Sequence, residues 1–349
     1  MSFRLRFLSL LAIFATVASV YWYLSRASHT PVEDNGAMSV ETSEGDEPIT
    51  PLPLTLDLDP AKVALGKRLF NEPLLSADNT ISCANCHDLA HGGHDGRARA
   101  FGIGGAVGGI NVPSVFNSGF NFRQFWDGRA ASLEDQIDGP VQHPKEMGST
   151  WPKVVADLKS SAGYSSDFNK IYPAGITPET VKDAIATFER SLYTPNSKFD
   201  RFLRGEKNSL DGEEEAGYRL FKELGCITCH QGVNVGGNMY EKIGLVENYF
   251  EHRGNIEQAD LGRYNLTKDE EHRYEFRVPS LRNVALTAPY FHDASAVDLE
   301  GAVAVMGKYQ LGVDLKPDQI ARIVKFLNTL TGEYEGRSLS EATMPERAK

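Results

Sequence analysis

All four cysteines of the 349-residue chain lie in two copies of one five-residue pattern. The copies are Cys83-Ala-Asn-Cys86-His87 and Cys226-Ile-Thr-Cys229-His230. Two thiols at this spacing can each form a thioether to a porphyrin vinyl group, and the adjacent histidine can then bind the iron. A redox-active dithiol, a zinc site or disulfides would leave both histidines unexplained. The pattern therefore predicts two covalently bound haem c groups, with His87 and His230 as iron ligands.

The two motifs belong to an internal duplication. A short segment with the pattern G-x-R-L-F precedes each motif, at residues 66–70 and 217–221. Each half also ends in a proline-started stretch with apolar residues at helical spacing. These residues are Val181, Ala184, Ile185, Phe188 and Leu192 after Pro178, and Ile320, Ile323, Val324, Leu327 and Leu330 after Pro317. A helix, a haem motif, loops and a closing helix form the order of a cytochrome c domain, so we predict a mostly α fold with two such domains in tandem.

The domain boundaries follow from shifts in composition. We predict an N-terminal cytochrome c domain over residues 57–200 and a C-terminal one over 201–349, separated where the helical pattern gives way to the polar stretch EKNSLDGEEE. Residues 27–56 contain six acidic residues and no Lys or Arg. Such a segment buries little apolar surface, so we expect a disordered acidic tether there.

The N-terminus contains an uncharged run at residues 7–24, flanked by Arg4, Arg6 and Arg26. This length suits a membrane-spanning helix, and the arginines orient the N-terminus toward the cytoplasm. We predict that residues 1–26 are an uncleaved inner-membrane anchor and that the rest of the chain is periplasmic. The alternative is a cleaved signal peptide, although the bulky residues of SVYWYLSRA do not fit a small-x-small cleavage site.

The charge of the chain argues against one class of partner. The formal net charge is −11, with 24% charged and 41% hydrophobic residues. These values are typical of a globular protein. The chain lacks the excess of Lys and Arg over Asp and Glu that nucleic acid binding needs. We therefore expect no nucleic acid partner.

Beyond the haem motifs, the chain resembles the bacterial di-haem cytochrome c peroxidases, a family that includes the tryptophan-modifying MauG-type enzymes. The resemblance covers about Leu65 to Gly332 and rests on NVPSVFN (111–117), QFWDGRA (124–130), GPVQHPKEM (139–147), GCITCHQGVNVGGNMY (225–240), LRNVALTAPYFHDA (281–294) and AVAVMGKYQLG (302–312). It implies reduction of hydrogen peroxide to water with electrons from a small c-type cytochrome or cupredoxin; a homodimer is left open. The alternatives are a MauG-like oxidase of a protein or organic substrate and a non-enzymatic electron-transfer or sensor protein.

For the C-terminal haem, the resemblance implies His230 and Met306 as the two iron ligands. A thioether favours ferrous iron and raises the reduction potential, which suits an electron store. An arbitrary methionine on an amphipathic helix would more often be a core residue. MauG-type enzymes place a tyrosine at this position, so Met306 favours a peroxidase.

For the N-terminal haem, many family members carry a second histidine ligand on the glycine-rich loop. When the chain is read without gaps from His87 to Asn111, that position falls on Ile103, which cannot bind iron. The resemblance then implies a five-coordinate or water-bound haem that leaves a position open for peroxide. The alternative is a shifted alignment in which His91 or His94 is the ligand.

The resemblance also assigns roles in peroxide cleavage. Glu146 is expected to transfer a proton between the peroxide oxygens as general acid and base, and Gln136 to hydrogen-bond the peroxide. An apolar Ile103 beside Glu146 would raise the carboxyl pKa by desolvation. Outside this motif, a lone glutamate such as Glu146 would more often be a solvated surface charge.

Two further roles concern the domain interface. Trp126 matches the family's tryptophan between the haems, where an indole assists electron transfer; a structural buried tryptophan is the alternative. The family also binds calcium at this interface, and its ligand positions fall on Asn111, Thr287 and Pro289, whose oxygen atoms suit Ca²⁺. We expect His292 to be structural.

Overall fold

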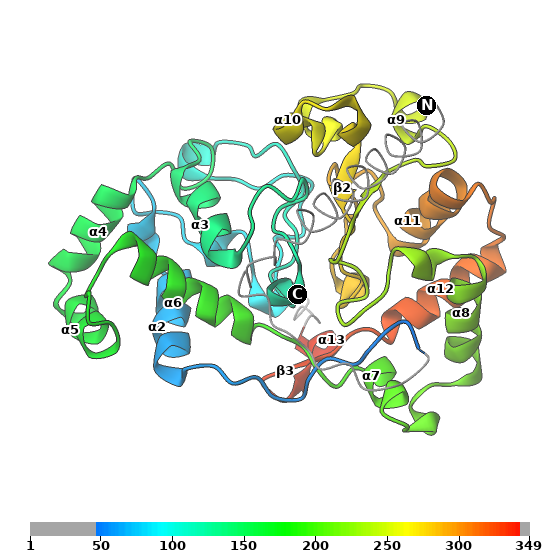
Figure 1. Ribbon diagram of the computed structural model, residues 1–349, viewed down its shortest axis with the longest axis horizontal. Coiled ribbons are helices and arrows are strands. Elements are labelled where there is room, and N and C mark those ends of the chain that lie inside the picture. Colours follow the sequence, from blue (N-terminus) through cyan, green and yellow to red (C-terminus); the bar gives the residue numbers. More distant parts are fainter. Residues whose placement is uncertain (1–46, 343–349) are drawn as a thin grey trace, which may run out of the picture. The chain divides into compact units, whose positions relative to one another are not determined.

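Two helical halves, each built around one pair of packed helices, make up the described fold (Figure 1). The computed structural model describes residues 47–342, so the predicted anchor lies outside the described residues. No helix within this part of the chain is long and apolar enough to cross a membrane. The first half contains α2 (Pro60–Phe70), α3 (Leu133–Gln142), α4 (Trp151–Ser160), α5 (Ala162–Ile171) and α6 (Pro178–Ser191).

The second half has the same plan with additional short elements. It contains α7 (Lys198–Leu203), α8 (Gly212–Glu223), α9 (Tyr249–Arg253), α10 (Tyr264–Thr267), α11 (Leu299–Val305) and α12 (Pro317–Asn328), and the strands β1 (Tyr240–Lys242) and β2 (Glu275–Arg277). β1 and β2 pair antiparallel, with Tyr240 opposite Arg277. The strands β3 (Glu333–Tyr334) and β4 (Arg337–Ser338) form a second antiparallel pair before α13 (Leu339–Ala342). The prediction of a mostly α fold is confirmed.

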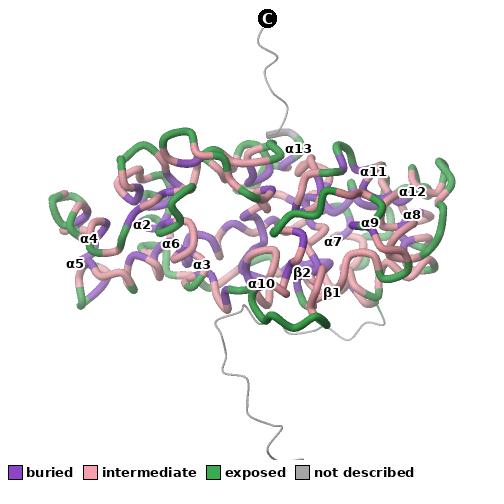
Figure 2. Tube along the Cα trace, turned by 90° about the horizontal axis from the view of Figure 1, so that it is seen from above, coloured by how far each residue is buried: buried purple, intermediate pink, exposed green. Residues whose placement is uncertain are grey.

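The helix pairs repeat the sequence duplication. α2 packs against α6 in the first half, and α8 packs against α12 in the second. Both closing helices, α6 and α12, begin with a proline, a residue whose missing N–H costs nothing in the first turn. Their apolar faces enter two separate cores; Figure 2 shows buried segments between the helices and exposed segments along the outer loops.

A glycine sits at the contact point of each helix pair. A Cβ atom on Gly66 would lie 1.9 Å from the carbonyl oxygen of Ala184, and one on Gly217 would lie 2.1 Å from that of Arg322. Only a residue without a Cβ lets the two helix backbones approach this closely. The glycine of the repeated G-x-R-L-F pattern therefore has the same packing role in both halves.

We expect Gly217→Ala to lower the free energy of unfolding by about 3 kcal/mol, at the upper end of overpacking costs, because the clash involves helix backbone. Chemical denaturation of the haem-loaded protein measures the loss. Gly163→Ala in α5 is the control, because a Cβ there would lie no closer than 3.9 Å to another atom. That variant should be unchanged or stabilised by up to about 1 kcal/mol. Equal effects in the two variants would contradict the close approach.

The ends of the described chain cross between the halves. Residues 47–56 were expected in the acidic tether, but Ile49 and Leu52 are buried and Ile49 belongs to the core of the second half. The Leu52 N–H donates to Asp200 Oδ1 at 3.2 Å. At the other end, Leu339 of α13 packs into a cluster of the first half that includes Phe70. The N-terminal end of the described chain thus packs on the second half, and its C-terminal end packs on the first half.

The core of the second half includes α7, which adjoins the predicted domain boundary at residue 200. Phe199 of α7 packs with Tyr218 and Phe326 in the core of the second half, with ring centroids 4.7 and 5.0 Å apart. Its side chain is fully buried. The core of the second half therefore begins before residue 200.

Candidate functional site

The two C-x-x-C-H motifs form the same short turn in both halves. Cys83–Asn85 and Cys226–Thr228 are 3-10 turns. In each, the histidine N–H donates to the carbonyl of the first cysteine, at 2.9 Å in the first motif and 3.1 Å in the second. The four thiols are free. Burial raises the pKa of Cys83 to about 12 and that of Cys226 to about 11, so neither thiol has the lowered pKa of a redox-active dithiol.

His87 is held in an orientation that suits an iron ligand. Its Nδ1 lies 3.1 Å from the carbonyl oxygen of Gly93. A protonated Nδ1 donates this hydrogen bond, which leaves the Nε2 lone pair free for a metal. Burial lowers the pKa of His87, so its imidazole is kept neutral, as a ligand must be.

In the second half, His230 and Met306 line the same cavity as Cys226 and Cys229. Much of the remaining lining is apolar and comes from α8, α11 and α12. Met306 begins a π-helical turn, Met306–Gln310, directly after α11; such turns are frequent at functional sites. Burial lowers the pKa of His230 to about 4. A neutral imidazole, a thioether and two thiols around one apolar cavity fit haem c.

The glycine-rich loop contacts the segment that carries Glu146. Ile103 begins a short turn, and its N–H donates to the Glu146 carbonyl at 2.8 Å. The Ile103 side chain lies over Gly148, where a Cβ would be 2.3 Å from the isoleucine Cδ1. Gly104 and Gly105 have φ values of 60° and 77°, and a Cβ atom added at either would have no contact within 4 Å. The loop thus places Ile103 beside Glu146, as the sequence resemblance implies.

The two histidines that could replace Ile103 have other partners. The Nε2 of His94 lies 3.1 Å from the Leu286 carbonyl oxygen, and its Nδ1 accepts the Gly96 N–H at 3.1 Å. Both ring nitrogens of this buried residue are therefore engaged. The Nδ1 of His91 lies 2.6 Å from Asp88 Oδ2, and 56% of its side chain is exposed. This geometry favours the gapless alignment.

Glu146 lies near the first haem motif. Desolvation raises its pKa, although the positive charges of His143 and Arg129 oppose the shift. The side chain is 45% exposed, and its Oε1 lies 3.5 Å from His143 Nδ1. Burial raises the pKa of Cys86 to about 11, and the Glu146 carboxylate adds to this shift. Gln136 is half-buried on α3.

Trp126 joins the first half to the cavity of the second. Its indole N–H donates to the Asn111 carbonyl at 2.9 Å, and both residues line the cavity of His230. The indole also packs against an aromatic cluster of the second half that contains Tyr249, Phe250 and Phe276. The position suits an electron-transfer residue between two haems, and the packing alone also accounts for a half-buried structural tryptophan.

The expected calcium ligands lie on the wall of the same cavity. Asn111, Thr287 and Pro289 all line it. The Asn111 Nδ2 donates to the carbonyl oxygens of Arg97 at 3.1 Å and Pro289 at 3.4 Å. Rotation of the amide by 180° would place Oδ1 beside these two carbonyls. Amide and carbonyl oxygens are typical Ca²⁺ ligands, so these residues fit the ion.

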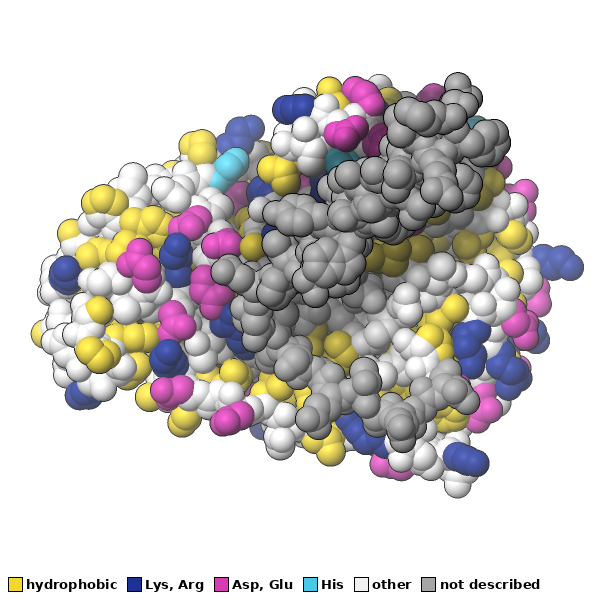
Figure 3. Space-filling model, viewed as in Figure 1, with side chains coloured by type: hydrophobic (Ala, Val, Ile, Leu, Met, Phe, Trp, Pro, Cys, Tyr) yellow, Lys and Arg dark blue, Asp and Glu magenta, His cyan; other side chains and the backbone are white. Residues whose placement is uncertain are grey.

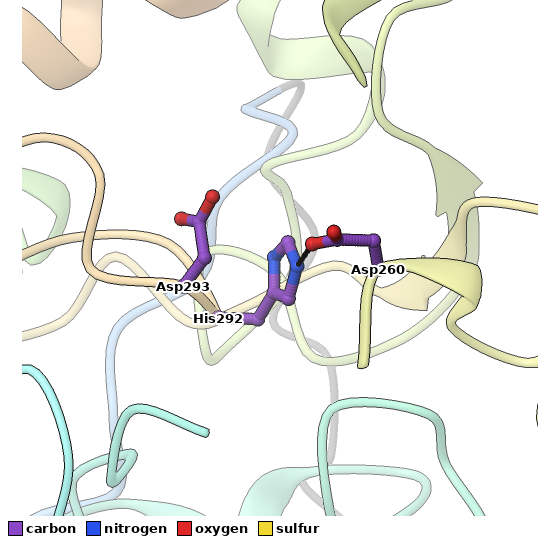
Figure 4. Close-up of side chains that lie close together, drawn as sticks. All are labelled: Asp260, His292 and Asp293. Atoms are coloured by element: carbon purple, nitrogen blue, oxygen red, sulfur yellow. Dashed lines mark hydrogen bonds and ion pairs between the residues drawn. The ribbon is translucent and has the colours of Figure 1, made fainter. Parts of the chain in front are cut away.

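A second group of residues of the kinds that bind metals lies next to Trp126. The ring centroids of Trp126 and His292 are 6.3 Å apart. Asp260, His292 and Asp293 have ligand atoms within 4.8 Å of one another (Figure 4). His292 Nε2 lies 2.7 Å from Asp260 Oδ1, and the Arg253 guanidinium forms ion pairs with both carboxylates. The arginine supplies the positive charge that a metal would otherwise bring. This arrangement supports the structural role expected of His292.

A buried carboxyl near the first haem motif was not predicted from the sequence. Glu189 of α6 is 6% exposed, and its Oε2 has no hydrogen-bond partner in the described part of the chain. Burial raises its pKa to about 8, and its charge contributes to the raised pKa of Cys83. A signal was present: Glu189 lies four residues after Ile185, on the apolar face of the predicted helix.

Comparisons with known proteins identify the relatives of this chain. Residues 60–208 match the family described as di-haem cytochrome c peroxidase. The chain is 49% identical over 290 residues to cytochrome c peroxidase Ccp of Escherichia coli strain K12, covering 83% of this chain and 62% of that relative. It is 42% identical over 301 residues to cytochrome c551 peroxidase of Nitrosomonas europaea, covering 85% of this chain and 89% of that relative.

A solved structure supports the fold. The crystal structure of a MauG-like protein associated with microbial copper homeostasis has a TM-score of 0.69 and 28% sequence identity, and the match covers 84% of this chain and 96% of that one. It shares the fold at lower sequence identity than the two peroxidases. Motifs, fold and relatives thus agree, and the chain belongs to the di-haem cytochrome c peroxidase family.

Proposed function

We propose that the chain binds two haem c groups and reduces hydrogen peroxide to water with electrons from a small c-type cytochrome or cupredoxin. The observation that carries this proposal is the cavity shared by His230, Met306 and two attachment cysteines. A thioether ligand at Met306 suits an electron store. The MauG-like alternative has a tyrosine at this position, which this chain lacks.

Residues of the first half would transfer the proton that peroxide cleavage requires. Haem bound at His87 would supply an iron that binds peroxide and passes electrons to it. Reduction of one H₂O₂ to two H₂O consumes two electrons and two protons. Glu146 would take a proton from one peroxide oxygen and return it to the other, as general base and then general acid. Gln136 would orient the peroxide by a hydrogen bond.

The residues at the interface would connect the two sites. Trp126 would assist electron transfer, since its indole contacts Asn111 and also lines the second cavity. Calcium bound by Asn111, Thr287 and Pro289 would fix the backbone around this tryptophan. Metal analysis of the purified protein tests that ion: one calcium per chain is expected, and its absence at saturating calcium would contradict the assignment.

Steady-state turnover tests the proposed activity. Purified protein, loaded with haem and supplied with a reduced small cytochrome, should oxidise two equivalents of cytochrome for each peroxide consumed. Absence of turnover with several reduced cytochromes and cupredoxins would favour the electron-transfer or sensor alternative. Formation of an oxidised protein or organic product in place of donor oxidation would favour the MauG-like alternative.

Met306→His should keep the second haem low-spin but lower its reduction potential, because an imidazole lacks the preference of the thioether for ferrous iron. Electron uptake from the donor should slow accordingly. A redox titration monitored by absorption measures the potential. An unchanged potential together with an intact long-wavelength Fe–S band would show that Met306 is not the ligand.

We also propose that the protein is held in the periplasm by its N-terminal anchor. The uncharged run at residues 7–24 and the flanking arginines support this. On the face shown in Figure 3, the basic and acidic side chains of the described residues are interspersed. This pattern agrees with a protein or small-molecule partner and gives no support to a nucleic acid partner.

Cell fractionation checks the anchor. The full-length protein should remain with the inner membrane, whereas a form lacking residues 1–27 behind a cleavable signal should be soluble and active. A soluble full-length product whose N-terminus begins near residue 28 would instead show that the segment is a cleaved signal peptide.

A further inference from the structure

One buried carboxyl in the first half lacks a positive partner. Of the acidic residues that the structure describes, Glu189, Asp200 and Asp260 are the buried ones. Asp200 forms an ion pair with Arg282 at 2.8 Å, and Asp260 forms one with Arg253. No ion pair between described residues includes Glu189, and its Oε2 has no hydrogen-bond partner among them. Charged groups are seldom buried without a partner, so Glu189 requires an explanation.

The position of Glu189 on its helix disfavours a negative charge. The residue lies in the last turn of α6, where the helix dipole repels an anion. The next residue, Arg190, directs its charge to Glu134 of α3 at 2.7 Å. Burial raises the pKa of Glu189 to about 8; the charge of Arg190 opposes this shift, and that of Glu134 adds to it. The ionised carboxyl therefore lacks a full counter-charge on its own helix.

The neighbouring helices do not provide that charge. α6 packs against α2 and α3. The charged residues of α3 are all acidic. Each basic side chain of α2 already has an acidic partner: Lys62 pairs with Asp183, Lys67 with Glu335 and Arg68 with Asp167. Among its described side chains, neither helix offers Glu189 a free cation.

Glu189 also lies close to the first haem motif. Cys83 packs against the buried cluster that contains Phe70 and Phe188. The Phe70 ring centroid lies 5.3 Å from that of Phe188 and 6.5 Å from that of His87. The charge of Glu189 contributes to the raised pKa of Cys83. A haem attached at Cys83 would therefore lie close enough for the charge of its iron to act on Glu189.

We propose that Glu189 takes up a proton when the haem attached at Cys83 is reduced and releases it when that haem is oxidised. The inference rests on the proposed function, which places a haem there. One electron from the donor converts ferric to ferrous iron, and one proton from solvent converts the carboxylate to a carboxylic acid. The ferric centre has the larger positive charge, so it favours the carboxylate.

The coupling keeps the charge of a buried site constant. An electron and a proton that arrive together add no net charge, which avoids the cost of burying one. Reduction of peroxide to water likewise consumes equal numbers of electrons and protons. Glu189 does not need to contact peroxide for this role, because it acts through the reduction potential of the haem.

The test measures the reduction potential of each haem as a function of pH in the haem-loaded protein. Below the pKa of Glu189 in both iron states the carboxyl is neutral, and above both it carries a negative charge that favours ferric iron. The one-electron equilibrium constant for reduction of the first haem should therefore fall about tenfold as the pH rises through this range, which corresponds to 59 mV.

Two variants isolate the contribution of Glu189. Glu189→Gln keeps the shape but cannot ionise, so the tenfold fall should be absent at the first haem. Glu179→Gln is the matched control, because Glu179 is an exposed carboxyl in the first turn of the same helix; it should keep the wild-type pH dependence. Glu146, whose pKa is also raised, is present in all three proteins, so its titration cancels in the comparison. The second haem should behave alike in all of them.

The outcomes separate this inference from the proposed function. Wild-type protein with fewer than two haems would contradict the proposed function itself. A Glu189→Gln protein with both haems and the wild-type pH dependence would overturn the role of Glu189 alone. If that variant does not fold, the reduced-minus-oxidised infrared spectrum of Glu146→Gln protein containing isotope-labelled glutamate decides. Reduction should then produce the signal of a labelled protonated carboxyl, and its absence would overturn the inference.

Discussion

Glu146→Gln is expected to lower peroxide turnover by about 10²- to 10⁴-fold, the usual contribution of a general acid–base group. Glutamine has nearly the same shape as glutamate but can neither take up nor release the proton. Steady-state kinetics with a reduced cytochrome donor measures the loss. Asp135→Asn is the control, because Asp135 is an exposed carboxylate on α3, the helix that also carries Gln136. Equal activity in the two variants would exclude Glu146 from proton transfer.

The pH dependence of turnover gives a second readout of Glu146. Its pKa is raised by desolvation, so the carboxyl remains protonated to a higher pH than an ordinary glutamate. Because the base form must accept the first proton, activity should fall as the pH drops through this raised pKa. The charge of His143 opposes the shift, so His143→Gln should move the acidic limb to still higher pH. A limb at the position of an ordinary glutamate in both proteins would contradict this.

The helical framework could be predicted because its signals are local. Pro178 and Pro317 mark the starts of the closing helices, and the apolar spacing that follows them marks the buried faces. The repeated glycine at positions 66 and 217 carried a packing role that the pattern did not reveal, since a close helix contact depends on residues more than 100 positions away.

The ends of the described chain could not be predicted in the same way. The acidic composition of residues 27–56 gave no indication that Ile49 and Leu52 are buried. The Leu52 N–H, for example, donates to Asp200, which is distant in the sequence. Leu339 is likewise buried against the opposite half of the fold. Burial of this kind depends on contacts that are distant in sequence, and average composition does not report it.

The candidate site likewise contains residues that the sequence predicts and residues that only the fold reveals. The two cysteines and the histidine of each motif were predictable because covalent attachment requires one fixed spacing. The burial of Arg277 on β2 was not predictable, because its sequence context, EFRVPS, is typical of an ordinary strand. Only the fold shows that its guanidinium is buried against neutral groups on a cavity wall.

Ile103 is the position at which this chain departs from the usual pattern of its family, and it leads to the last prediction. If no protein side chain fills the second position on the haem of His87, no loop movement is needed to open it. The fully oxidised protein should therefore show one high-spin and one low-spin haem and should react with peroxide without prior reduction. Absorption and EPR spectra of the oxidised protein, followed by stopped-flow mixing with peroxide, test both statements.

Ile103→His should convert this behaviour into one that depends on reduction. The loop can present a new ligand only if Ile103 exchanges its present contacts, the hydrogen bond to the Glu146 carbonyl and the packing over Gly148. The open space around Gly104 and Gly105 permits that movement, although ordering glycines has an entropic cost. The variant should then show two low-spin haems when oxidised and should react at least about tenfold more slowly until it is reduced, a change of about 1.4 kcal/mol in the barrier.

Ile103→Leu separates ligation from packing. Leucine keeps the apolar contact over Gly148 and offers no ligand, so this variant should retain the high-spin signal and the reaction of the oxidised protein. Slow reaction in both variants would mean that loop packing, and not a new histidine ligand, controls access. Two low-spin haems in the oxidised wild-type protein would contradict the gapless alignment. His94 or His91 would then have to leave its carbonyl or carboxylate partner to reach the iron.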